Sequence, residues 1–437
     1  MAYILRGKLA LSGVLVILLS ACGQQTQQPA HSLEAVAENY AKLVLALGEH
    51  DAGYVDAYYG PEEWQTEINN NPSSLADIAE QANTLMAELS AHPPAENADE
   101  INKLRHQYLE KQLGALAARV AMLNGETLRF DEETAALYDA VAPRHDAAYF
   151  QAILDEIDAL LPGEQNLSER INGYRSRFVI PTDKLSDVFD AAIAACRERT
   201  LQHITLPENE NFRIEYVNDK PWSGYNWYQG NAYSLIQINT DLPIFIDRAV
   251  DLGCHEGYPG HHTYNVLLEK HLVRDRGWVE FSVYALFSPQ SLIAEGSANY
   301  GIDMAFPGDE RLHFERDVLY PIAGLDADEA ERYAELRKQL KKLNYAGNEA
   351  ARAYLNNDMN REQAIEWLVT YALMSPERAA QRVDFIDTYR GYVINYNLGH
   401  DMVREYVERL SADQDDDVRW EAFGRLLASP RLPSGLK

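Results

Sequence analysis

The chain is poor in cysteine and in basic residues, and each shortage excludes a class of protein. Three cysteines in 437 residues are too few for a disulfide framework. Lysine and arginine number 39 against 67 aspartates and glutamates, which gives a net charge of −28. That acidity argues against nucleic acid as a partner, because phosphates need a basic surface. The 46% hydrophobic content, in contrast, supports a large core and excludes intrinsic disorder.

Long apolar runs are also scarce, and the one near the N-terminus has the pattern of a secretory signal. Arg6 and Lys8 precede an apolar stretch over residues 9–19, which is too short to cross a bilayer comfortably. We therefore interpret residues 1–21 as a signal peptide. No later run of 18 or more apolar residues exists, so the sequence predicts no other membrane-spanning segment.

The end of this signal, Leu19-Ser-Ala-Cys-Gly, resembles a bacterial lipobox. The resemblance implies cleavage before Cys22 and a lipid on its thiol; a plain signal peptide cut nearby is the alternative. Residues 22–32 would then be the lipidated cysteine and a flexible polar tether. This predicts an extracytoplasmic protein anchored by lipid in a membrane. Gly23 is not an Asp-type retention signal, which favours the outer membrane if the source has two membranes.

Beyond the tether, apolar residues recur mostly at helical spacing, so the sequence predicts a mainly α fold over 33–437. Asn360 and Gln363 form a start signal for one of these helices. The helices are expected over 33–47, 75–91, 101–116, 146–160, 182–202, 289–304, 327–344, 360–373, 375–390 and 400–410.

Two short segments, 212–217 and 233–239, are β-branched and aromatic and predict a small pair of strands. The residues between them, 222–230, are rich in aromatics and glycine, and we expect a loop that either lines a substrate site or packs as a turn. The acidic run 413–417 lacks the glycine and final glutamate of an EF-hand loop. It is better explained as the start of a helix, where negative charge is favourable.

The segment His255-Glu-Gly-Tyr-Pro-Gly-His-His carries the clearest chemistry. A His-Glu pair opens the zincin motif, in which two histidines bind zinc and the glutamate acts as general base. The usual second histidine, four residues on, is replaced here by Pro259, and the next histidine is His261. On a straight helix, six residues correspond to a rise of about 9 Å along the axis, so the two rings would diverge.

Pro259 resolves this difficulty because a helix must open there. Proline cannot donate to the carbonyl four residues before it, and its ring clashes with that carbonyl. Gly260 tolerates the dihedrals needed to close the gap. A bulge of about two residues would return His261 to the face of His255. His262 is the weaker alternative, since it lies about 10 Å further along the helix.

A third ligand is expected on the helix that begins near Pro289. This helix is apolar nearly all round, yet Glu295, Asn299 and Asp303 form one stripe along it. Buried carboxylates are unfavourable unless they are paired or bind a metal. Glu295 is therefore the candidate ligand, and Asn299 is a candidate to orient a ligand histidine. A solvated stripe on a half-exposed helix is the alternative.

The sequence resembles the large bacterial family catalogued as domain of unknown function 885, whose members are predicted zinc peptidases and are often lipoproteins. The resemblance covers most of the chain and is strongest from about 230 to 400. It rests on the motifs 130–138, 231–239, 255–262 and 295–300. It implies a large helical zincin-like domain with a central cleft and a small β element beside the metal helix.

The family pattern also implies roles for single residues. It makes His255, His261 and Glu295 the zinc ligands and Glu256 the general base. A later Tyr-x-x-Gly segment matches at Tyr396 and Gly399, although Arg390 and Tyr392 replace the proline and glutamine of the family pattern. By analogy with related zinc peptidases, Tyr396 is the candidate donor to the oxyanion; His262 and His400 are the alternatives.

The sequence thus predicts a zinc-dependent peptidase with a peptide as substrate and an open fourth zinc position. Two other interpretations stay open. One is a binding or scaffold lipoprotein whose zinc is structural or absent, with Cys254 as a conceivable fourth ligand. The other is a zinc hydrolase acting on amide bonds outside peptides. Pairing of Cys196 with Cys254 is not decided by the sequence, and Arg390 or Arg404 is a candidate partner for a substrate carboxylate.

Overall fold

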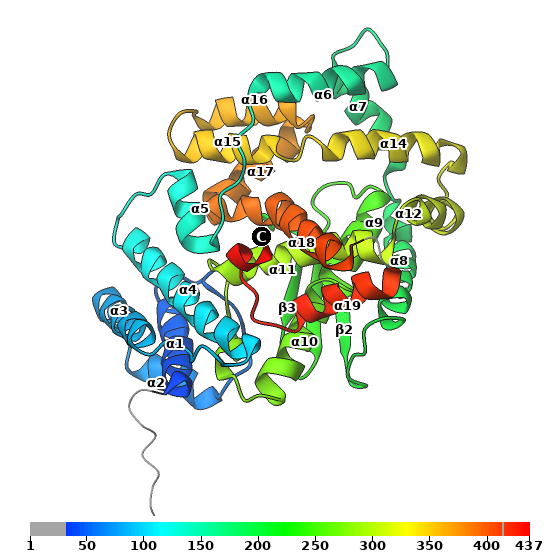
Figure 1. Cartoon of the computed structure of the whole chain (residues 1–437). Coiled ribbons are helices and arrows are strands. Elements are labelled where there is room, and N and C mark those ends of the chain that lie inside the picture. The colour runs from blue at the N-terminus through cyan, green and yellow to red at the C-terminus, as the bar shows by residue number, and fades with distance from the viewer. Residues whose placement is uncertain (1–31, 413–414) are drawn as a thin grey trace, which may run out of the picture.

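A computed structural model describes residues 32–412 and 415–437 and shows a mainly helical protein with two small sheets (Figure 1). The signal peptide, Cys22 and most of the tether lie outside these residues, so they stay predictions. The helices are Leu33–Gly48 (α1), Glu62–Asn70 (α2), Leu75–Ala91 (α3), Glu100–Leu123 (α4), Phe130–Tyr138 (α5), Ala147–Leu160 (α6), Leu167–Arg175 (α7), Leu185–Leu201 (α8), Asp247–Leu252 (α9), His261–Leu268 (α10), Pro289–Ala305 (α11), Glu310–Phe314 (α12), Tyr320–Ala323 (α13), Ala330–Lys341 (α14), Ala346–Leu355 (α15), Arg361–Tyr371 (α16), Pro376–Tyr389 (α17), Ile394–Ser411 (α18) and Asp416–Leu427 (α19). The strands are Val55–Tyr58 (β1), Asn211–Val217 (β2), Gly224–Tyr228 (β3), Tyr233–Asn239 (β4) and Val283–Ala285 (β5).

The predicted helices are confirmed, because each range expected from the sequence contains a helix. Asn360 caps α16 as predicted. Its side-chain oxygen accepts from the backbone N–H of Gln363 at 2.9 Å, and the side-chain oxygen of Gln363 accepts from the backbone N–H of Asn360 at 2.9 Å. Asp415 accepts from the backbone of Val418 at the start of α19, so the part of the acidic run that the structure describes does begin a helix. Within 32–412 and 415–437, no helix has the length and apolar content that a membrane crossing requires.

The predicted strand pair is also present, but the segment between its strands differs from expectation. β2 and β4 pair in parallel, and residues 224–228 form β3, which pairs with β4 in the antiparallel direction. The interpretation of this segment as a loop is therefore wrong for Gly224 to Tyr228. The glycines at its ends suggested a turn, whereas the alternating aromatic residues between them fit a strand. β1 and β5, which the sequence did not indicate, form a second antiparallel pair.

α11 runs through the middle of the molecule and is crossed by α18 (Figure 1). The N-terminal helices α1 to α4 group on one side, and α6, α15 and α16 cover the top in this view. Nearly every residue of α11 is buried, as its apolar composition predicts. The central position of α11 places Glu295 in the interior, between α18 and the segment that carries His255.

Candidate metal centre

The segment carrying the two candidate histidines is a helix interrupted as the sequence predicts. α9 continues into a π-helical turn over Gly253–Gly257, Tyr258 is extended, and α10 begins at His261. Gly260 is required at the break, because a β-carbon there would lie 1.8 Å from the carbonyl oxygen of His255. The interruption brings the His255 and His261 rings together, with centroids 4.7 Å apart.

Three donor atoms from two distant segments meet at this point. The Nε2 atoms of His255 and His261 lie 3.1 Å apart. Oε2 of Glu295 lies 3.2 Å from the former and 3.7 Å from the latter. In a tetrahedral zinc site with bonds of about 2.1 Å, ligand atoms lie about 3.4 Å from one another. The three distances therefore fit a divalent metal without rearrangement.

Hydrogen bonding around the three donors fits the same interpretation. Glu295 Oε2 is fully buried and has no hydrogen-bond partner among the described residues. Its other oxygen accepts from the hydroxyl of Tyr392 at 2.7 Å. Nδ1 of His255 lies 3.1 Å from the Asn299 amide oxygen, to which it donates, so the His255 Nε2 lone pair points toward Glu295. A carboxylate oxygen without a hydrogen-bond donor, placed beside an imidazole lone pair, is the arrangement of ligand atoms expected at a cation site.

The charges at the cluster show how strongly these groups are coupled in the protein alone. Burial opposes ionisation of Glu295, but His261 and His255 hold the pKa of Glu295 well below its usual range. Burial likewise opposes protonation of His261, but Glu295 outweighs it and raises the pKa of His261 to about 9. The site therefore stabilises one positive charge beside Glu295, which a metal ion would supply in place of a proton.

His262, the weaker ligand candidate, points elsewhere. Its Nδ1 lies 2.8 Å from the Ser234 hydroxyl and its Nε2 lies 3.1 Å from Glu210 Oε2. Both ring nitrogens are thus engaged against the sheet, and His262 is completely buried. Of the two histidines that the sequence left open, the structure brings only His261 to His255 and Glu295.

Of the three candidate oxyanion donors, Tyr396 is the one beside the cluster. Its ring stacks 6.5 Å from the ring of His255, and its carbonyl accepts from the Asn299 amide at 3.0 Å. Burial raises the pKa of Tyr396 well above its usual value, so its hydroxyl stays protonated at neutral pH. His400 instead lies 2.7 Å from Asp303 and 3.2 Å from Asp401, and His262 faces the sheet.

Glu256 follows the first ligand and faces strand β3. A β-carbon on Gly224 would lie 2.8 Å from Glu256 Oε1, so this glycine leaves the space in which the carboxylate lies. The Asn226 amide holds the Glu256 backbone by donating to its carbonyl at 2.7 Å. The carboxylate itself has no hydrogen-bond partner among the described residues, and Glu256 is 4% exposed. Burial raises the pKa of Glu256 above its usual value, and His255 and His261 oppose that shift.

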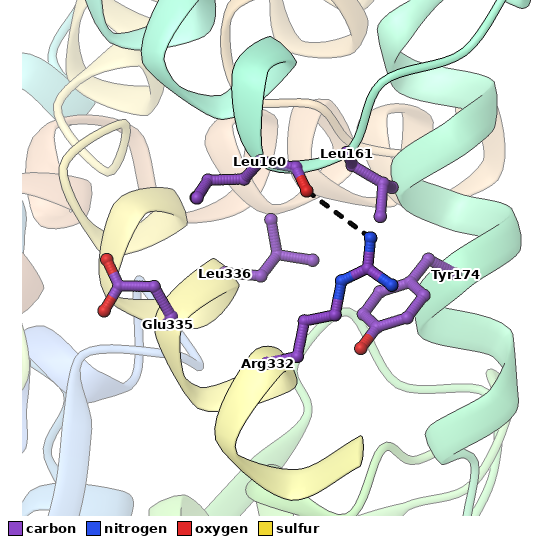
Figure 2. A pocket seen from close by; sticks show the side chains of 6 residues that line it. All are labelled: Leu160, Leu161, Tyr174, Arg332, Glu335 and Leu336. Atoms are coloured by element: carbon purple, nitrogen blue, oxygen red, sulfur yellow. Dashed lines mark hydrogen bonds between the residues drawn. The ribbon is translucent and has the colours of Figure 1, made fainter.

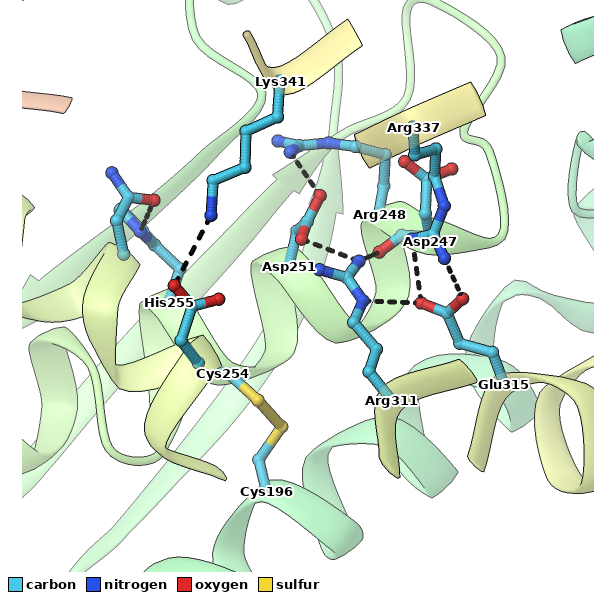
Figure 3. A network of polar contacts seen from close by, with 12 residues as sticks. Cys196, Asp247, Arg248, Asp251, Cys254, His255, Arg311, Glu315, Arg337 and Lys341 are labelled. Atoms are coloured by element: carbon cyan, nitrogen blue, oxygen red, sulfur yellow. Dashed lines mark hydrogen bonds and ion pairs between the residues drawn. A yellow bond between two sulfur atoms is a disulfide. The ribbon is translucent and has the colours of Figure 1, made fainter. Parts of the chain in front are cut away.

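Cys254 is bonded to Cys196 in a disulfide, which the sequence left open (Figure 3). This pairing removes Cys254 as a fourth metal ligand, so that part of the scaffold interpretation is wrong. Among the residues that the structure describes, the only group of three or more potential metal donors is His255, His261 and Glu295. The disulfide ties the turn that carries His255 to α8.

A network of ion pairs fixes α9, the helix immediately before that turn (Figure 3). Asp251 lies 3.0 Å from Arg248 and 2.9 Å from Arg311. Arg311 also reaches Glu315 at 2.7 Å, and Glu315 pairs with Arg337 at 2.5 Å. Every carboxylate in this network has a partner, so we assign it a structural role in holding α9.

A further carboxylate faces the centre and was missed by the sequence interpretation. Asp56 lies where the pairing of β1 and β5 is irregular, and irregular pairing of this kind re-aims side chains. It accepts a hydrogen bond from the Tyr225 hydroxyl of β3. Burial raises the pKa of Asp56 to about 6, although the hydrogen bond from Tyr225 acts to lower it. Nothing in its local sequence signals this position, because the contact joins segments 169 residues apart.

The two arginines proposed from the sequence as partners for a substrate carboxylate are already engaged. Arg390 contacts the buried Glu133 with nitrogen–oxygen distances of 2.6 and 2.9 Å. Arg404 lies 3.5 Å from Asp401, one helical turn away. Neither is therefore a candidate for a free anion-binding group.

Two hollows of the molecule lie apart from the metal cluster. One, of about 60 Å³, is lined by Leu160, Leu161, Tyr174, Arg332, Glu335 and Leu336 (Figure 2). The other, of about 380 Å³, lies between α8 and β2. Neither includes a residue of the cluster, so the expected central cleft stays a prediction.

No protein-family model and no curated protein matches the chain. Among solved structures, one from Colwellia psychrerythraea, described as a "putative lipoprotein", is 15% identical with a TM-score of 0.46, covering 92% of this chain and 77% of that one. A second structure, from Shewanella oneidensis and described as a "putative lipoprotein of unknown function", is 14% identical with a TM-score of 0.41. The match covers 92% of this chain and 79% of that one. An M32 carboxypeptidase from Deinococcus radiodurans R1 is 13% identical with a TM-score of 0.39, covering 90% and 89%. At these low scores, function has to be argued from the residues of this chain.

Proposed function

We propose that the protein is a zinc-dependent peptidase that hydrolyses peptide bonds. The observation that carries the proposal is the convergence of His255 Nε2, His261 Nε2 and Glu295 Oε2, with all three donor atoms within 4.8 Å of one another. Glu295 Oε2 has no hydrogen-bond partner among the described residues. Two histidines and a glutamate are a common ligand set of catalytic zinc sites, which leave a fourth position for water or substrate. The adjacent Glu256 supplies the unpaired carboxylate that such a site needs.

The residues of the chain divide the chemical work as follows. A zinc ion bound there would act as a Lewis acid and lower the pKa of a water molecule. Glu256 accepts a proton from the attacking water and later delivers it to the leaving amine. The Tyr396 hydroxyl, which is protonated and has no partner among the described residues, donates to the carbonyl oxygen as negative charge develops.

The decisive experiment compares Glu256→Gln with the wild-type protein after loading with zinc. We expect one zinc per chain in both proteins, and a loss of peptide hydrolysis of about 100-fold or more in the variant. Glu208→Gln, at an exposed glutamate, is the matched control and keeps full activity. Full activity of Glu256→Gln on a cleavable peptide would refute the mechanism. A folded, zinc-free and inert wild-type protein would favour a binding lipoprotein instead.

We further propose that Cys22 carries a lipid and anchors the enzyme on the extracytoplasmic side of a membrane, in the outer membrane if the source has two. The support is the sequence around Cys22 alone, which lies outside the described residues. Cys22→Ser should release the protein from the membrane fraction and abolish labelling with a fatty acid. Retention of labelled Cys22→Ser protein in membranes would contradict this proposal.

A further inference from the structure

Arg382 of α17 has no acidic partner among the described residues. Among the described residues its guanidinium takes part in no hydrogen bond and no ion pair. Its side chain is half-buried, and its nitrogens nevertheless keep contact with solvent. Arg390, a few residues further along, shows the ordinary arrangement, since it is bonded to Glu133.

The side chains around Arg382 pack against the guanidinium but offer it no hydrogen-bond acceptor. Its central carbon lies 4.9 Å from the ring centre of Phe385 and 5.8 Å from that of Tyr396. Gly347 of α15 adds no side chain over it; a β-carbon there would lie 3.9 Å from Nη2. Aromatic faces and a glycine leave all five N–H groups free for an acceptor.

Tyr396 connects this arginine to the metal cluster. The Tyr396 ring lies against the ring of His255 as well as near Arg382, so one tyrosine separates the guanidinium from a candidate metal ligand. Burial lowers the pKa of Arg382, and the negative charge of Glu295 is among the influences that oppose this shift. Arg382 is thus within the electrostatic reach of the third candidate ligand.

A half-buried cation without a counter-ion is costly unless a ligand supplies the opposite charge. The planar fork of an arginine matches a carboxylate in bidentate fashion, which makes it a selective group for that anion. In a peptide, the terminal carboxylate carbon lies only one residue, about 3.6 Å, beyond the carbonyl carbon of the last peptide bond. An arginine one side chain away from the metal ligands is therefore placed to hold that terminus.

We propose that Arg382 binds the C-terminal carboxylate of the substrate, so that the enzyme removes single residues from the C-terminus of peptides. This inference rests on the proposed peptidase function and adds the end of the substrate that is recognised. Water adds to the carbonyl carbon of the last peptide bond, and the carbon–nitrogen bond breaks. The products are one free amino acid, whose amine takes up the proton delivered by Glu256, and a peptide shortened by one residue.

The first test uses pairs of N-acetylated peptides that differ only in a free or amidated C-terminus. Zinc-loaded wild-type protein should release the last residue from the free acids, with kcat/KM at least about 100-fold above that for the amides, as expected for loss of a charge-assisted bidentate contact. Arg382→Gln should lower kcat/KM for the free acids by a similar factor and leave the amides unchanged. Arg404→Gln, at an arginine paired with Asp401, is the matched control and should behave as wild type.

A second measurement does not depend on turnover. Benzylsuccinate has one carboxylate for a metal and a second at the distance of a peptide terminus. Its affinity for zinc-loaded Glu256→Gln protein should fall at least about 10-fold when Arg382→Gln is added, with zinc content unchanged. Equal cleavage of free and amidated peptides, or cleavage confined to internal bonds, would overturn the proposal for Arg382 while leaving the peptidase intact. A zinc-loaded wild type without peptidase activity would refute the proposed function itself. Benzylsuccinate affinity that is the same with and without Arg382→Gln would independently refute carboxylate binding by Arg382.

Discussion

Gly296 of α11 and Gly399 of α18 meet backbone to backbone where the two helices cross. A β-carbon on Gly296 would lie 2.4 Å from the carbonyl carbon of Gly399, and one on Gly399 would lie 2.7 Å from the carbonyl oxygen of Leu292. Glu295 directly precedes one of these glycines, and Tyr396 lies three residues before the other. The close approach of the two helices is therefore what brings a candidate ligand and a candidate oxyanion donor to one centre.

Gly399→Ala should separate these helices. Because the neighbouring atoms are backbone and cannot move aside, we expect a loss of about 1–3 kcal/mol in the free energy of unfolding, as for overpacked cores. Zinc affinity should fall as well, since Glu295 shifts with α11. Thermal unfolding and zinc titration measure the two effects. Gly424→Ala on α19, where a β-carbon meets nothing within 4 Å, is the control and should be neutral or slightly stabilising.

The parts of the site predictable from sequence are those that local chemistry dictates. Pro259 and Gly260 force a break at the right place between His255 and His261, whatever the rest of the fold does. Glu295 was identifiable because a carboxylate on an otherwise apolar helix needs a partner.

Other features depend on tertiary contacts and leave no local pattern. Asp56 reaches the centre from a strand 169 residues before its partner Tyr225. Arg382 has no acidic partner among the described residues, and a missing partner is invisible in a sequence. β3 was mistaken for a loop because its glycine, Gly224, is required by the position of Glu256 rather than by a turn.

Gly224→Ala tests that last relationship. The added methyl group would lie 2.8 Å from Glu256 Oε1 and 2.9 Å from a methyl group of Leu252, so the carboxylate has to move. We expect kcat to fall by about 10-fold or more, because small displacements of a general base are costly. Zinc binding should be unchanged, since neither histidine is touched. Zinc content and peptide hydrolysis measured on one preparation separate the two, and loss of zinc would show that β3 supports the ligands instead.

Asn299 orients His255, and its replacement should weaken metal binding without removing a ligand. Asn299→Ala leaves Nδ1 of His255 without its acceptor and cuts the hydrogen bond to the Tyr396 carbonyl. Losses of this kind raise the zinc dissociation constant by about 10–100-fold. Asn299→Asp restores an acceptor for His255 and should recover most of the affinity. Competition with a chelator of known affinity measures both variants, and equal affinity of Asn299→Ala and wild type would contradict the role.

The buried Glu210 makes the stability of the sheet beside the metal segment depend on pH. Burial opposes its ionisation, but hydrogen bonds from His262, Tyr258 and Arg197 outweigh this and lower the pKa of Glu210 to about 2. Since the folded-state pKa is below the unfolded value, the stabilisation is complete above about pH 4.5 and is lost as the pH falls toward 2.

Replacing the carboxylate isolates this contribution. Glu210→Gln should lower the free energy of unfolding by up to about 3 kcal/mol at pH 7, and the difference from wild type should shrink steadily between pH 5 and pH 2. Denaturant titrations across that range measure it. Glu208→Gln, at an exposed carboxylate two residues away, should track wild type at every pH. A difference between Glu210→Gln and wild type that stays constant with pH would show that the variant acts through packing against His262 and Tyr258 rather than through charge.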